Sequence, residues 1–87
     1  MLEDMTAETF IAHLHEQFHV DSHPVELIEV TEIPREPGGR APFSIVFQGG
    51  PSRPLPQRIY TVEHAELGAL EIFLVPIAAD RYEAVFT

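Results

Sequence analysis

Cysteine, lysine and tryptophan are absent from this chain of 87 residues. Without cysteine, the protein has no disulfide framework, no thiolate metal site and no cysteine nucleophile. Long apolar runs are also missing, since none approaches the ~20 residues that a membrane-spanning helix requires. The first residues are acidic and lack the basic segment and apolar stretch of a signal peptide. We therefore expect a cytoplasmic, soluble protein that has no membrane partner.

Positive charge is scarce, because five arginines oppose 14 acidic residues and give a formal net charge of −9. Such a surface repels phosphate backbones and anionic lipids, which disfavours nucleic acid as a partner. The common explanation for this acidity is solubility. The alternative is attraction to a basic partner surface.

The length of the chain favours a single domain, residues 1–87. A domain of this size buries only roughly 60–65% of its unfolded surface, so its core is thin. Burial against a protein partner or a second copy would add stability. Within the domain we expect a helical part, residues 1–18, and a β-rich part, residues 19–87.

Apolar residues at helical spacing mark the N-terminal part. Phe10, Ile11, Leu14 and Phe18 fall on one side of a helix over residues 6–18. A thin β domain needs a cover for its apolar face. We therefore expect this amphipathic helix to pack on the sheet of its own domain.

Extended runs separated by turns dominate the rest of the chain, at residues 42–47, 58–63, 69–76 and 81–86. In the first of them, Phe43, Ile45 and Phe47 share one face and are expected to line the core. The run 69–76 is apolar on both faces and predicts a central strand buried on both sides. Residues 25–33 alternate imperfectly, so either both faces are partly buried or a bulge near Leu27 shifts the phase.

These patterns predict an α+β fold, in which one N-terminal helix packs on a curved antiparallel sheet of five strands. Residues 19–20 would add a short sixth strand. The strands are expected to run mainly as a meander, in a sheet that is either open or closed into a small barrel.

Four motifs are spread over the β-rich part of the chain. They are Pro-Phe-Ser-x-x-Phe at 42–47, His-x-x-Leu-Gly at 64–68, Phe-Leu-Val-Pro at 73–76 and Tyr-Glu-Ala-Val-Phe at 82–86. With these motifs the chain resembles a family of small bacterial proteins classed as a domain of unknown function. The resemblance brings no established activity. It implies an accessory role in a phage-tail-like or secretion structure, because relatives are encoded near tail-collar-like proteins.

Histidines form the one cluster that suggests metal chemistry: His13, His15, His19 and His23 lie within eleven residues. On a continuous helix, His15 and His19 would lie one turn apart on one face, the spacing of a two-histidine metal pair. A clear third ligand is missing. We therefore predict no metal and no cofactor, and keep as an alternative a small metal- or ligand-binding protein that uses residues 13–23, with His15 and His19 as its candidate ligands.

No catalytic motif is recognisable. Ser44 lies within a predicted strand rather than on a Gly-x-Ser-x-Gly elbow. Glu71 and Glu83 would form a carboxylate pair if the last hairpin placed them opposite each other, but outward acidic residues are common. His64 lies in a turn, which predicts a hydrogen bond from its side chain to the backbone. We therefore predict no catalytic residue and a non-enzymatic interaction or assembly module.

The last predicted strand, residues 81–86, is the candidate interface. If this strand lies at the edge of an open sheet, its unpaired N–H and C=O groups would accept a strand from another chain. Tyr82, Ala84 and Val85 would then contact a second copy or a protein partner. Closure against the first strand would bury both edges and allow a monomer.

Overall fold

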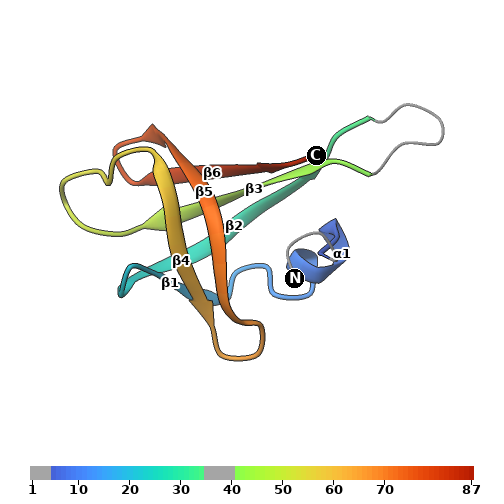
Figure 1. The fold of residues 1–87 in the computed structure, drawn as a ribbon, viewed down its shortest axis with the longest axis horizontal. Coiled ribbons are helices and arrows are strands. Elements are labelled where there is room, and N and C mark those ends of the chain that lie inside the picture. The colour runs from blue at the N-terminus through green and yellow to red at the C-terminus, as the bar shows by residue number, and fades with distance from the viewer. Residues whose placement is uncertain (1–4, 35–40) are drawn as a thin grey trace.

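The computed structural model describes residues 5–34 and 41–87. One short helix, α1 (Ala7–Ile11), precedes six strands: β1 (Gln17–Val20), β2 (His23–Glu32), β3 (Phe43–Gly49), β4 (Arg58–His64), β5 (Gly68–Ala78) and β6 (Arg81–Phe86). The strands form a closed antiparallel barrel in the order β1-β2-β3-β6-β5-β4 (Figure 1). The predicted combination of an N-terminal helix and a curved antiparallel sheet is confirmed, and the sheet is closed.

The connections differ from a simple meander. After β3 the chain crosses to β4, and β6 later returns to lie between β3 and β5. β1 closes the barrel by pairing with β4 through His19 opposite Glu63 and Val20 opposite Val62. Of the two alternatives for residues 81–86, the free edge does not occur, because β6 has a hydrogen-bonded neighbour on both sides.

The helix is shorter than the apolar spacing predicts. After Ile11 the chain continues in tight turns, in which His13 N–H donates to the Phe10 carbonyl at 2.9 Å and Leu14 N–H to the Ile11 carbonyl at 3.2 Å. His15 then has a positive φ of 71°, which redirects the chain into β1. Phe18 is consequently a strand residue, and it is buried from there.

The change of phase in β2 is a bulge. Leu27 lies opposite Phe47, whereas Glu29 lies opposite Val46, so Ile28 is the extra residue. The bulge confirms one of the two predicted explanations. Leu27 and Val30 are three positions apart and would point to opposite faces of a regular strand. Because the bulge adds one residue, both side chains pack in the core.

Alternate strand residues fill the barrel. Phe43, Ile45 and Phe47 are buried as predicted, and Leu14 packs against this core. The prediction that β5 is buried on both faces is wrong: Leu70, Ile72 and Leu74 point inward, but Phe73 is 49% exposed. The outer wall of a one-layer barrel faces solvent unless another element covers it.

Two different segments close the ends of the barrel (Figure 1). At one end Phe10 of α1 is fully buried, with its ring centroid 5.8 Å from Phe43 and 5.5 Å from Phe86. At the other end the loop 50–57 lies over the tyrosines: Tyr82 Oη accepts the Leu55 N–H at 2.9 Å, and Tyr60 Oη donates to the Pro56 carbonyl. Among the described residues, no helix has the length and apolar character needed to span a membrane.

Candidate functional site

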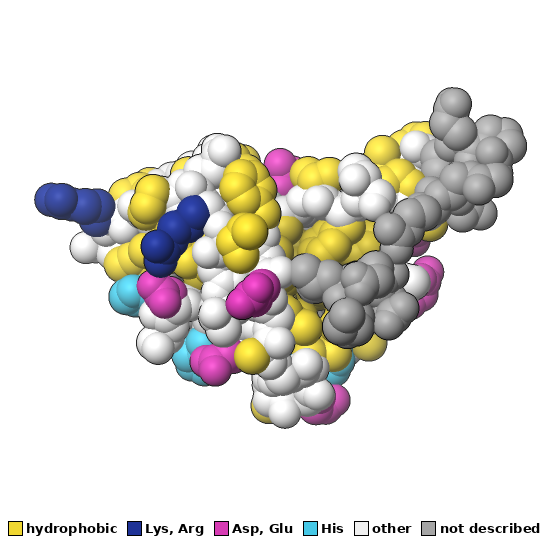
Figure 2. All heavy atoms as spheres, viewed as in Figure 1, with side chains coloured by type: hydrophobic (Ala, Val, Ile, Leu, Met, Phe, Trp, Pro, Cys, Tyr) yellow, Lys and Arg dark blue, Asp and Glu magenta, His cyan; other side chains and the backbone are white. Residues whose placement is uncertain are grey.

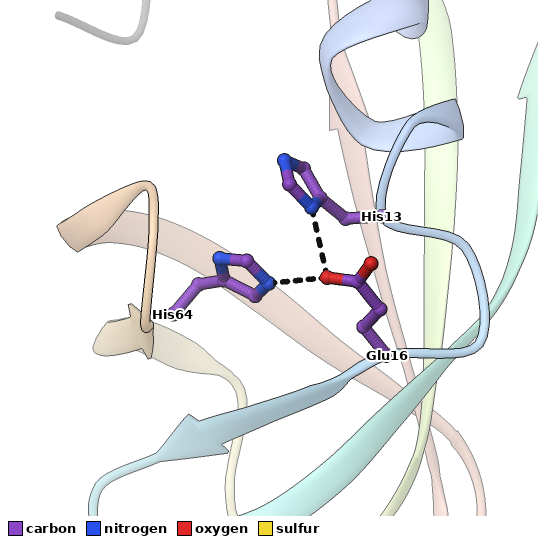
Figure 3. Close-up of side chains that lie close together, drawn as sticks. All are labelled: His13, Glu16 and His64. Carbon is purple, nitrogen blue, oxygen red and sulfur yellow. Dashed lines mark hydrogen bonds and ion pairs between the residues drawn. The ribbon is translucent and has the colours of Figure 1, made fainter.

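Three polar side chains from distant parts of the sequence meet near α1. His13 and Glu16 lie between α1 and β1, and His64 is the last residue of β4 (Figure 3). Nδ1 of His13 and Nε2 of His64 both lie 2.8 Å from the same atom, Oε1 of Glu16. One carboxylate oxygen thus bridges two imidazoles and ties the α1–β1 connection to the end of β4.

The three side chains differ in exposure. The His64 side chain is 4% exposed and that of His13 13%, whereas that of Glu16 is 47% exposed. The ring centroid of His64 lies 4.4 Å from that of His13 and 4.5 Å from that of Phe18. The imidazoles are therefore held among other rings, and solvent reaches the cluster from the side of Glu16.

Hydrogen bonds to the backbone define which nitrogen of His64 carries the proton. The N–H groups of Glu66 and Leu67 point at Nδ1 of His64, at 3.0 and 3.2 Å. Nδ1 must therefore accept, so the proton of the neutral ring lies on Nε2 and is donated to Glu16. This arrangement agrees with the predicted bond from the His64 side chain to the turn backbone.

The two imidazoles hold the pKa of Glu16 below its ordinary value of 4.5. The hydrogen bond from His13 is the main cause and the bond from His64 is the second, while partial burial opposes both. Glu16 is therefore an ionised acceptor at neutral pH, which requires His13 to donate from Nδ1 as well.

The cluster has the composition of a metal site, since one ligand atom from each residue lies within 4.8 Å of the others. The proton positions do not fit one. A metal on Nε2 of His64 would need the lone pair there and would move the ring proton to Nδ1, against two backbone N–H groups. Metal-bound histidines instead donate a hydrogen bond from their second nitrogen. The geometry fits a hydrogen-bonded contact between two segments better than a metal centre. We call this contact of His13, Glu16 and His64 the latch.

The two histidines kept as candidate metal ligands in the alternative hypothesis do not share a helix face. His15 lies in the left-handed turn and its Nδ1 is 2.9 Å from Glu26 Oε2. His19 lies in β1, with its Nε2 3.2 Å from Gln17 Nε2. Their predicted spacing required a helix through residue 19, and α1 ends at Ile11. Sequence spacing also missed the contact of His64 with Glu16, because 48 residues separate the two.

The carboxylates considered as a catalytic pair are likewise apart. Glu71 lies opposite Thr61 on β4, and Glu83 lies opposite Val75 on β5. Glu71 is thus four positions along β5 from the partner of Glu83, a separation of roughly 13 Å along the strand. The register therefore does not bring these two carboxylates together.

The predicted interface residues divide between the inside and the outside of the barrel. Tyr82 is fully buried and Ala84 is 2% exposed, so both belong to the core. The expectation that they contact another chain is wrong, because β6 is paired on both sides and these side chains point inward. Val85 points outward and is 55% exposed.

The outer wall of the barrel carries exposed apolar side chains, including those of β5 that the sequence pattern predicts to be buried. Ile59 of β4 lies directly opposite Phe73 of β5, and they are 62% and 49% exposed. Val75 follows Phe73 on the same face of β5 and is half-buried. We call Ile59, Phe73 and Val75 the outer patch. Figure 2 shows hydrophobic side chains on this wall, with acidic and arginine side chains beside them.

The fold defines a small antiparallel β-barrel protein that has a helix over one end and a His–Glu–His latch beside it. Its residues 5–86 match the family described as "Domain of unknown function (DUF6916)", and the chain belongs to this family. No curated protein and no solved structure shows detectable similarity to the chain.

Proposed function

We propose that this domain is a non-enzymatic interaction module that binds a protein partner through the outer patch. The observation that carries the proposal is the direct pairing of Ile59 with Phe73 on the outside of the barrel. Two large apolar side chains that are each about half exposed or more, side by side on a rigid wall, lose unfavourable contact with water when a partner covers them. Hydrogen-bonded strands also hold them in place, which lowers the entropy lost on binding.

The polar cluster supports a structural role rather than a catalytic one. Glu16 Oε1 is occupied by both imidazoles, and His64 uses both ring nitrogens in hydrogen bonds. A general base needs a free lone pair within reach of a substrate. The shared oxygen and the His64 ring therefore favour a latch that holds the fold.

Assembly with larger structures is part of the same proposal. The resemblance of the motifs to the bacterial family implies a place in a phage-tail-like or secretion apparatus, and a small rigid barrel suits an accessory subunit. The partner is then a component of that apparatus. A homodimer through the same patch is the alternative, which sedimentation equilibrium at micromolar concentration distinguishes by the mass of the purified protein.

Retention of partners by matched surface variants tests the proposal. We expect the wild-type domain, immobilised and exposed to an extract of its native host, to retain a defined set of proteins that Phe73→Ser does not retain. Ile11→Ser is the control, because Ile11 is also exposed, at 44%, but lies on α1. Equal retention by all three proteins, with unchanged circular dichroism, would place the binding surface elsewhere.

A further inference from the structure

The charged residues around the outer patch bear on the chemistry of a partner that binds it. Glu71 precedes Phe73 by two positions on β5 and therefore points to the same side of the wall. Glu83 of β6 lies directly opposite Val75. Acidic side chains thus stand on two sides of the apolar group.

These carboxylates are not neutralised within the described part of the protein. Among residues 5–34 and 41–87, no ion pair involves Glu71 or Glu83. Arg58 instead lies 3.6 Å from Asp21 and stacks on Tyr60, at the barrel end covered by the loop 50–57. The arginines seen in Figure 2 also lie toward that end.

We infer that the outer patch binds a partner surface with apolar side chains at its centre and lysine or arginine at its rim. This inference rests on the proposed function and adds the chemistry of the partner. A basic rim gains from Glu71 and Glu83, whereas an acidic rim would place like charges together. A second copy fits poorly, because it would bring the same carboxylates and another net charge of −9 to the interface.

A display library of random twelve-residue peptides provides the probe. Peptides selected on the wild-type domain are expected to combine aromatic or aliphatic residues with lysine and arginine, and to carry net positive charge. Their binding should be lost on Phe73→Ser and on Ile59→Ser, each checked for a folded circular dichroism spectrum. Two variants are used so that the test survives if one of them fails to fold.

Charge variants then separate electrostatics from burial. We expect Glu71→Gln with Glu83→Gln to weaken binding of the selected peptides about tenfold, which corresponds to two rim ion pairs of ordinary strength. Glu32→Gln with Glu66→Gln removes the same charge from exposed positions outside the outer patch and should leave binding unchanged. Added salt should weaken binding to the wild type more than to the first double variant.

The outcomes distinguish the two proposals. Peptides that depend on Phe73 but have no positive charge and no response to Glu71→Gln with Glu83→Gln would overturn the inferred partner chemistry while leaving the interaction module intact. Peptides that bind equally to Phe73→Ser, Ile59→Ser and the wild type, or a failure to select any peptide, would overturn both. Selected peptides that are basic and sensitive to both sets of variants support both.

Discussion

At the scale of single residues, His64 is the polar group on which the site depends most. Its ring is almost fully buried, yet Nδ1 accepts two backbone N–H groups and Nε2 donates to Glu16. Among the described residues, no buried side-chain nitrogen or oxygen lacks a partner. An unpaired buried polar group costs about 1–3 kcal/mol, so complete pairing lets this small core include an imidazole.

Glu16 makes the latch sensitive to acid. Its pKa is lowered in the folded state, so the ionised carboxylate stabilises the fold. This contribution is fully present above the ordinary pKa of 4.5 and is lost as the pH falls through the lowered value. We expect Glu16→Gln to be less stable than the wild type at neutral pH. The difference in unfolding free energy should shrink as the pH falls through the lowered pKa of Glu16.

Urea unfolding of both proteins across a pH series measures this effect. Both proteins contain all the other carboxylates, whose titration affects them alike. The difference in unfolding free energy between the two proteins therefore reports on Glu16. A difference in unfolding free energy that is the same at neutral pH and at about pH 3 would contradict the latch.

At the scale of elements, the connection between β1 and β2 is a two-residue turn with unusual backbone angles. Asp21 and Ser22 have φ of 52° and 72°, which is the left-handed region at both central positions. Such turns match the twist of a hairpin but favour asparagine or glycine. Serine at the second position is therefore less stable there than glycine would be.

Ser22→Gly is expected to raise the free energy of unfolding by about 1 kcal/mol, because glycine adopts positive φ without steric strain. Asp21 is kept, since it lies close to Arg58. Ser44→Gly is the matched control: Ser44 lies within β3, where glycine should lower stability. The midpoint of urea unfolding checks both signs, and a Ser22→Gly variant no more stable than the wild type would refute the argument.

Local pattern predicted the strands better than the helix. Period-two alternation in Phe43, Ile45 and Phe47 and the phase change near Leu27 reflect the burial of one face, which sequence records directly. The apolar spacing of Phe10 and Phe18 is also compatible with a turn followed by a strand, so it overstated the helix. Which of these the chain adopts depends on long-range packing that spacing does not record.

At the scale of the whole molecule, barrel closure explains most of the differences from the sequence predictions. Pairing of β1 with β4 and of β3 with β6 joins segments far apart in the chain, and nothing in a local pattern specifies it. Pairing with β3 and β5 removes the edge of β6, and the closed barrel buries Tyr82 and Ala84 and brings His64 to Glu16. It also turns Phe73 outward, so the apolar character of β5 becomes part of the surface.

Photo-crosslinking from within the outer patch tests most directly our proposal that this patch is the binding surface. A benzophenone-bearing phenylalanine analogue is placed at position 73 in the native host, and at position 11 in a control protein. We expect a crosslinked partner, basic in composition, from position 73 and none from position 11. Crosslinks of equal yield from both positions, or none from position 73 while the purified domain retains its partner, would contradict it.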